Sequence, residues 1–368
     1  METILHIGMQ KTGSTTLQKF MHAHSSDLLN ASVLYPEIFD GHINHNILAF
    51  SVYDQSRLPR EFAAFSKKSP EKFELKKRLA MDAVEASVAK AKPKRLVISA
   101  EYLSGIHYAG FPSVDRLKGL RNWLSKMSDS IKVLMYVRRP SDWYLSHLQQ
   151  TVKGSSKFPP FDAFQIRETI ENYTQVFGEV VVRKFDRESL IDGDIRTDFL
   201  GSQLKDVNLS HLNLNREHVR NQSLSAESIR LLMSYRAKVM PEKDDLLTPE
   251  THYIVTSLEA VERKASIALS KPCLPKNVKF HINHSNRELE WLKENHGVEF
   301  EGIDYQAIDE GMVSPTEESV SLGEDSAKLD ELRYRLIEEL SKNGYPVFKP
   351  LRAKVKTLLG EIWDSLRR

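Results

Sequence analysis

The sequence has little cysteine and no strong excess of charge of either sign. Cys273 is the single cysteine among 368 residues, so no disulfide can form within the chain. One cysteine favours a reducing compartment over an oxidising one. The formal net charge is only +2, whereas proteins that coat nucleic acids are typically strongly basic. We therefore expect no nucleic-acid partner.

The sequence also has no long apolar run. No stretch approaches the roughly 20 apolar residues that a transmembrane helix requires. The start, Met1-Glu2-Thr3, carries no basic segment before a short apolar run that ends at Gly8, unlike a secretory signal. We expect a soluble cytoplasmic protein. Hydrophobic residues make up 40% of the chain, which is enough for a large core.

Several short apolar segments have the pattern of buried strands. They are residues 4–8, 33–35, 95–101, 131–139 and 180–186. Each is a nearly continuous apolar run, as expected for a parallel sheet that is covered on both faces. Helical patterns lie between them, and one of these would present Leu79, Ala83, Ala86 and Ala89 on a single face. This alternation predicts an α/β fold.

Beyond about residue 200 the patterns are mostly helical. Helices are predicted over 225–239, 250–269 and 286–296. The last of these would begin with a capping box formed by Ser285 and Glu288, and it would end at Gly297.

The segment 310–327 is polar, acidic and aperiodic, which predicts a linker or mobile loop. Two C-terminal helices would follow in 328–368. The second, at about 350–367, is basic and amphipathic. Such a helix can lie on an anionic membrane, but amphipathic helices usually cover a protein core, and we favour the latter.

The stretch ILHIGMQKTGSTTLQKF, residues 4–20, has the features of an anion site. It reads as a strand, a turn between Gly8 and Gly13 that contains Lys11, and a helix. It is not a Walker A motif, because the lysine precedes the second glycine. Even so, the amides at the helix start and the lysine would attract an anion. Hydroxyl donors are Thr12, Ser14, Thr15 and Thr16. The alternative is a helix start with an incidental lysine.

The stretch 131–150 predicts a second anion site. Its strand ends in Arg138-Arg139, Pro140 breaks it, and Ser141 can cap a helix that carries Ser146 in its second turn. The ends of parallel strands meet at one edge of a sheet, so Arg138 and Ser146 could hold a second phosphate of the same ligand.

The two stretches together resemble the nucleotide-binding signatures of the sulfotransferases that use PAPS, 3′-phosphoadenosine-5′-phosphosulfate. The family's first signature, P-K-[ST]-G-[ST]-[ST], corresponds to residues 10–15, with Gln10 in place of proline. Its second signature is R-x-P followed by a serine eight positions after the arginine, which matches Arg138, Pro140 and Ser146. The resemblance covers about residues 4–200. It is nearest to bacterial and carbohydrate-directed members.

The resemblance implies a fold, a domain plan and ligand contacts. The fold would be a P-loop NTPase-like, three-layer α/β fold with a central parallel sheet and a mostly helical C-terminal half. The α/β domain would cover 1–309, with a helical substrate region at about 205–300. The 3′-phosphate of PAPS would lie against Arg138 and Ser146, and the 5′-phosphosulfate would be held by Lys11, Thr12, Gly13, Ser14, Thr15 and Thr16.

The expected general base is Glu101, at the end of the strand 95–101. Carbohydrate sulfotransferases of the heparan type place a catalytic glutamate similarly, and Lys11 would stabilise the leaving phosphate. His45 and His147 are rival bases, because cytosolic sulfotransferases use a histidine. Asp186 could instead be a metal ligand, although the basic residues around it favour an ion pair.

The expected reaction is sulfuryl transfer from PAPS to a hydroxyl or amine, with PAP as product and no metal required. The acceptor would be a small molecule or glycan, and the family resemblance favours a carbohydrate or glycolipid. His45 and Gln150 are candidate acceptor contacts. Two alternatives stay open: a P-loop kinase that uses Mg-ATP, and a catalytically silent nucleotide-binding protein. The sequence does not indicate an oligomeric state.

Overall fold

A computed structural model describes most of the chain. The described residues are 1–39, 42–53, 69–105, 110–209, 212, 223–243, 246–264, 268–316 and 320–342. The predicted helix at 350–367 lies outside them.

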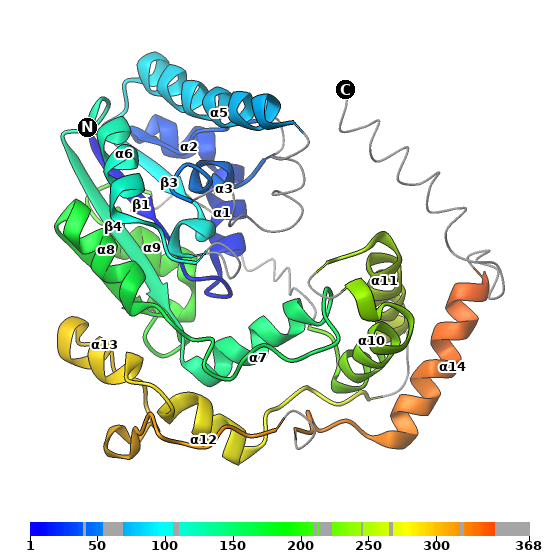
Figure 1. Ribbon diagram of the computed structural model, residues 1–368. Helices are drawn as coiled ribbons and strands as arrows, with labels where there is room; N and C mark the ends of the chain where they lie inside the picture. The colour runs from blue at the N-terminus through cyan, green and yellow to red at the C-terminus, as the bar shows by residue number, and fades with distance from the viewer. Residues whose placement is uncertain are drawn as a thin grey trace. The chain divides into compact units, whose positions relative to one another are not determined.

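A five-stranded parallel sheet forms the centre of the α/β part (Figure 1). Its strand order is β2-β3-β1-β4-β5. The strands are β1 Glu2–His6, β2 Val33–Leu34, β3 Arg95–Ser99, β4 Ser130–Val137 and β5 Val180–Lys184. Each lies within or overlaps one of the five apolar segments, so the predicted α/β fold with a parallel sheet is confirmed.

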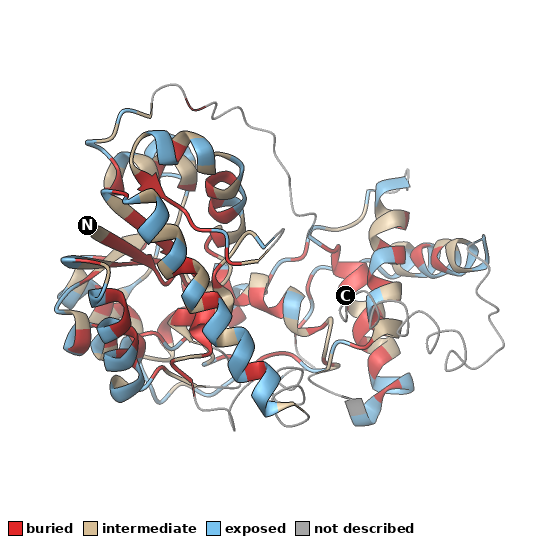
Figure 2. Ribbon diagram, turned by 90° about the horizontal axis from the view of Figure 1, so that it is seen from above, coloured by how far each residue is buried: buried red, intermediate tan, exposed pale blue. Residues whose placement is uncertain are grey.

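Both faces of the sheet are covered, as the continuous apolar runs predict. Neighbouring residues of a strand point to opposite faces, and Ile4 and Leu5 in β1 are both fully buried. On the Ile4 face, helices α1 (Ser14–Ala23) and α9 (Ile195–Gln203) contribute Leu17 and Phe199 to one core. Figure 2 shows the strand that starts at the N-terminus mostly in red, the colour of buried residues. Burying such side chains stabilises the fold by roughly 1.5–3 kcal/mol each.

Two compact units divide the chain. The first comprises Met1–Trp143, Phe164–Glu217 and Asn283–Glu310, and it contains the whole sheet. Its helices include α1 Ser14–Ala23, α2 Ser25–Asn30, α3 Asn46–Ala49, α5 Pro70–Ala91, η2 Glu101–Ser104, α6 Val114–Ser125, α8 Arg167–Phe177, η3 Ile191–Gly193, α9 Ile195–Gln203, α13 Glu288–His296 and η5 Tyr305–Ala307.

The second unit comprises Tyr144–Ala163, His218–Ile282 and Gly311–Arg368. It contains α10 Ala226–Val239, η4 Pro241–Lys243, α11 Pro249–Lys264 and α14 Ser326–Lys342. Two of the boundaries between the first and the second unit fall within helices, namely α7 Pro140–Thr151 and α12 Lys276–His284. Its described residues include no strand, in agreement with the predicted helical C-terminal half. Helix α13, predicted as part of the helical substrate region, belongs to the first unit.

Two predictions about helices need correction. Helix α13 begins after Arg287 without a capping box, because Glu288 accepts the backbone N–H groups of Ile166 and Arg167 at 2.9 and 2.8 Å instead. Helix α5 buries Phe73, Ala80 and Val84, whereas Leu79 is exposed. Both errors arise because contacts with distant segments decide which groups are satisfied or covered.

The segment 310–327 is also not simply a mobile linker. Its residues Val320 and Leu322 are buried, and the Leu322 carbonyl accepts the N–H of Cys273 at 3.0 Å. Glu324 forms an ion pair of 2.7 Å with Arg230. These contacts anchor residues 320–324 within the second unit.

Candidate anion-binding site

Three neighbouring strands end at the same edge of the sheet, and each is followed by a predicted site residue. The turn with Lys11 follows β1, Glu101 follows β3 and Arg138 follows β4. Strand β1 pairs with β3 on one side and with β4 on the other. In open α/β sheets, ligands bind beyond the carboxyl ends of the strands, at the point where neighbouring strands continue into helices on opposite faces of the sheet. The fold therefore brings these three segments together.

The backbone of the turn after β1 is held in an unusual conformation. Lys11 and Gly13 both have positive φ angles, 67° and 76°. For Lys11 this costs about 1–2 kcal/mol, and such strain persists where the surrounding structure enforces it, often at functional sites. The Thr12 hydroxyl donates to the Met9 carbonyl at 2.5 Å, so this side chain fixes the turn from within.

Helix α1 starts at this turn without a side-chain cap. Its N-cap residue is Gly13, whose carbonyl accepts the N–H groups of Thr16 and Leu17 at 2.9 and 3.1 Å. No side chain of the described residues accepts a hydrogen bond from the first amides. The unpaired N–H groups and the positive end of the helix dipole make this start suited to an anion.

Arg138 lies against the same turn. Its Nη1 donates to the Lys11 carbonyl at 3.3 Å, and its guanidinium carbon lies 6.0 Å from the centre of the Phe185 ring. Burial lowers the pKa of Arg138 below its ordinary value, an effect that the charge of Asp142 partly offsets. Within the described ranges no carboxylate forms an ion pair with this guanidinium. A partly buried cation without a paired anion is costly, and an anionic ligand would compensate it.

Glu101 is joined to the start of α1. Its Oε2 accepts a hydrogen bond from the Ser14 hydroxyl at 2.5 Å. Glu101 is the first residue of η2, and the last residue, Ser104, donates to the Gly8 carbonyl at 3.1 Å. The predicted base and the predicted anion turn are therefore in direct contact at both ends of η2.

His45 does not fit its predicted roles. Its ring is buried, Nδ1 accepts the Ser99 N–H at 2.9 Å, and Nε2 therefore donates to the Pro36 carbonyl at 2.8 Å. Burial lowers the pKa of His45 to about 4, although both backbone contacts oppose this shift. With both ring nitrogens engaged, His45 connects segments of the core, and this geometry argues against its use as a base or acceptor contact.

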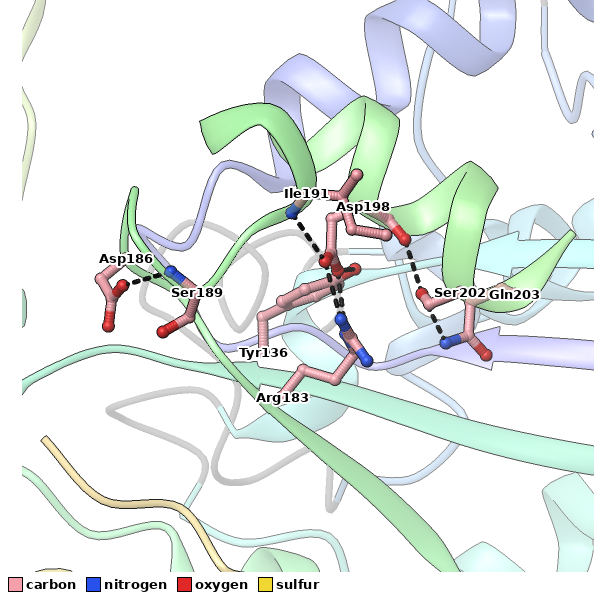
Figure 3. A network of polar contacts seen from close by, with 8 residues as sticks. All are labelled: Tyr136, Arg183, Asp186, Ser189, Ile191, Asp198, Ser202 and Gln203. Atoms are coloured by element: carbon pink, nitrogen blue, oxygen red, sulfur yellow. Dashed lines mark hydrogen bonds and ion pairs between the residues drawn. The ribbon is translucent and has the colours of Figure 1, made fainter. Parts of the chain in front are cut away.

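Asp186 does not have the geometry of a free metal ligand. Its Oδ1 accepts the N–H group of Ser189 at 2.8 Å (Figure 3). The same oxygen accepts the N–H group of Glu188 at 3.1 Å, and Lys184 lies 3.3 Å from Oδ2. Burial would raise the pKa of Asp186, but these hydrogen bonds and the charge of Lys184 lower it overall. The carboxylate thus closes a turn after β5, in agreement with the predicted ion pair.

Ser146, His147 and Gln150 lie on helix α7, beyond the point where the chain enters the second unit. Helix α7 begins directly after Arg139, whose carbonyl accepts the N–H groups of Asp142 and Trp143 at 3.1 and 2.9 Å, so Ser141 is not its cap. His147 is buried. The roles predicted for Ser146 and Gln150 stay predictions.

A buried polar cluster beneath the turn was not predicted. His6 Nδ1 and the Ser99 hydroxyl lie 2.8 Å apart, and Gln18 donates to the same hydroxyl at 3.2 Å. All three side chains are buried. The only signal in the sequence is that each is a polar residue next to apolar positions of a predicted strand or helix. Such a signal does not reveal which residues pair.

Comparison with family models, with curated proteins and with solved structures returned no match. In the described ranges no helix combines the length and apolar character that crossing a membrane requires. Nor do the described residues include a group of three His, Cys, Asp or Glu side chains placed to hold a metal ion.

Proposed function

We propose that this protein is a PAPS-dependent sulfotransferase. The support is the resemblance of the two signatures together with their placement at adjacent strand ends. The proposal takes the 5′-phosphosulfate to lie at the start of α1 and the 3′-phosphate to lie near Arg138. A P-loop NTPase-like fold is part of the same proposal.

The environment of Arg138 is the observation that carries the proposal. Its guanidinium is hydrogen-bonded to the backbone of the turn, at Lys11, next to an uncapped helix start. Two kinds of positive group therefore converge in one place, the point charge of a guanidinium and the amides of α1. A ligand with two separate phosphate groups would contact both the guanidinium and the amides of α1. A helix start that binds no ligand would not require a guanidinium beside it.

Each residue of the proposed site has a separate role in the reaction. In sulfuryl transfer the acceptor oxygen forms a bond to sulfur while the bond from sulfur to the 5′-phosphate oxygen breaks. Glu101 takes the acceptor proton, and its contact with Ser14 holds its carboxylate at the helix start. Lys11 and the amides of α1 stabilise the charge that develops on the leaving phosphate. Alignment of these groups supplies much of the expected rate.

The acceptor and the cellular location belong to the proposal as well. We propose a carbohydrate or glycolipid hydroxyl as acceptor and a cytoplasmic location, both from the family resemblance and the single cysteine. The kinase alternative requires a carboxylate that binds Mg²⁺ beside the phosphates. Asp186 was the candidate, and its engagement by two backbone N–H groups and Lys184 does not favour this reading.

Transfer of ³⁵S from labelled PAPS to a panel of polysaccharides and glycolipids tests the proposal. Wild-type protein should label at least one acceptor. Glu101→Gln should lower the rate at least 100-fold, the scale of a lost general base, while the affinity for PAP changes little. Glu179→Gln is the matched control, because Glu179 is exposed and precedes β5 at the opposite edge of the sheet. Failure to bind PAP, or equal rates for Glu101→Gln and wild type, would contradict the proposal.

A further inference from the structure

His6 is a fully buried histidine at the edge of the proposed site. It is the last residue of β1, and the turn that contains Lys11 follows it. Its ring lies edge-on to Tyr136 and Phe199, with centroid distances of 5.8 and 6.2 Å. In the sheet register it is opposite Ser99 of β3, two residues before Glu101. His6 thus lies at the strand end that carries the turn, next to the strand end that carries the proposed base.

The hydrogen bonds of Ser99 assign the tautomer of His6. Gln18 donates to the Ser99 hydroxyl oxygen at 3.2 Å, so this oxygen is an acceptor there. Among the described residues the hydroxyl hydrogen has one acceptor within reach, His6 Nδ1 at 2.8 Å. A neutral ring that accepts at Nδ1 carries its proton on Nε2. Burial lowers the pKa of His6 to about 4, so the ring is neutral at pH 7.

The Nε2 edge of the ring occupies the space beside Gly8. A Cβ atom at residue 8 would lie 2.5 Å from Nε2 and 2.9 Å from Cε1 of His6. The Gly8 carbonyl accepts the Ser104 hydroxyl at 3.1 Å. Gly8 is therefore held between the His6 ring and η2. No protein atom in the described ranges accepts a hydrogen bond from Nε2, although this atom is buried.

The same residues connect the turn to Glu101. The His6 carbonyl accepts the N–H of Ala100 at 3.0 Å, and the His6 side chain is tied to Ser99. Glu101 follows directly, and its carboxylate returns to Ser14. A shift of the His6 ring would move Gly8 and Ser99 in relation to each other, and with them the turn and the base.

We propose that His6 is a positioning residue of the anion site, whose ring supports Gly8 and whose bond to Ser99 aligns the turn with Glu101. The support of Gly8 is a structural statement about this chain. The alignment of Glu101 rests on the proposed function.

A double-mutant cycle on Gly8→Ala and His6→Ala tests the support of Gly8 without any ligand. Gly8→Ala should lower the urea midpoint of unfolding in the wild-type background, because its methyl group meets Nε2. In the His6→Ala background the same substitution should shift the midpoint by less than half as much. Equal shifts in the two backgrounds would overturn the support of Gly8. Gly119→Ala, which meets no atom within 4 Å, is the control and should give equal shifts in both.

The alignment is tested by removing the His6–Ser99 bond from either side. His6→Phe keeps an aromatic ring but removes the ring nitrogens, and Ser99→Ala removes the hydroxyl. Each should lower the rate of ³⁵S transfer at least tenfold with less than a threefold change in the Kd of PAP, and the double variant should be no slower than the slower single variant. Unchanged rates, or multiplicative losses in the double variant, would overturn the alignment.

Failure of the proposed function can be distinguished from failure of the proposed role of His6. If wild-type protein neither binds PAP nor transfers sulfate, the proposed function is wrong and the alignment of Glu101 falls with it, but the Gly8 cycle still decides whether His6 supports the turn. The ¹⁵N shifts of the His6 ring give a further readout. They should report a neutral ring protonated on Nε2 at pH 6, and a protonated Nδ1 would contradict the assigned tautomer.

Discussion

Replacement of Asp198 by asparagine should destabilise the α/β unit. The Asp198 carboxylate is fully buried and accepts four hydrogen bonds that join β4, β5, η3 and α9 (Figure 3). The donors are the Tyr136 hydroxyl at 2.6 Å, Arg183 Nε and Nη2 at 2.8 and 2.7 Å, and the Ile191 N–H at 3.2 Å. Burial, followed by this carboxylate, raises the pKa of Tyr136.

The expected loss can be estimated from these contacts. Breaking a buried ion pair by removing one partner costs about 3–5 kcal/mol. The Arg183 side chain is 30% exposed and can be partly hydrated. The asparagine amide would also turn an NH₂ group toward at least one donor, which leaves a buried polar group unpaired at about 1–3 kcal/mol. We therefore expect Asp198→Asn to lower the free energy of unfolding by about 2–4 kcal/mol.

Urea unfolding followed by circular dichroism measures this loss. Asp115→Asn is the control, since the Asp115 side chain is 92% exposed and pairs only with Lys118 among the described residues. Pairs of this kind contribute about 0–1 kcal/mol, so the control should behave almost as wild type. A loss below about 1 kcal/mol for Asp198→Asn, or equal losses for both variants, would refute the reasoning.

Two further predictions concern pH and glycine. His6 and His45 have their pKa lowered to about 4 by burial, so the unfolded chain binds protons that the folded chain does not between about pH 6.5 and 4. Stability should therefore fall by roughly 2 kcal/mol per histidine from pH 7 to 5; urea midpoints that do not change over this interval would contradict the burial of both rings. Gly13→Ala should cost about 1–2 kcal/mol, because φ is 76° and a Cβ would lie 2.9 Å from Phe185. Gly119→Ala, in open space on helix α6, should instead stabilise the protein by about 0.5–1 kcal/mol. Urea unfolding measures both variants, and a change of the same sign in both would be inconsistent with the backbone geometry.

The sheet could be predicted because its evidence is local. Each strand is a short apolar run with a breaker or polar residue after it, as with Gly8 and Glu101, and parallel strands expose their ends at one edge. The proximity of Arg138 to the turn could be predicted in the same way, because the end of a strand that pairs in parallel with β1 lies beside the end of β1.

The partners of buried polar residues could not be predicted, because they depend on register and on distant segments. The pairing of His6 with Ser99 requires the β1–β3 register, and the engagement of both His45 nitrogens requires Pro36 and Ser99 to meet around it. For the same reason Glu288 appeared as part of a capping box, although it binds the backbone of Ile166 and Arg167.

Calorimetric titration with adenosine 3′,5′-bisphosphate (PAP) and adenosine 5′-phosphate tests most directly whether the turn and Arg138 form one site for a ligand with two phosphates. Wild-type protein should bind PAP without Mg²⁺ and at least tenfold more tightly than the monophosphate, the scale of one charge-assisted hydrogen bond. Arg138→Gln should abolish that preference, whereas the control Arg121→Gln, on helix α6 with its Nη1 bound to the Val176 carbonyl, should retain it. Equal affinities of wild-type protein for the two nucleotides, or tighter binding of Mg-ATP than of PAP, would contradict the account.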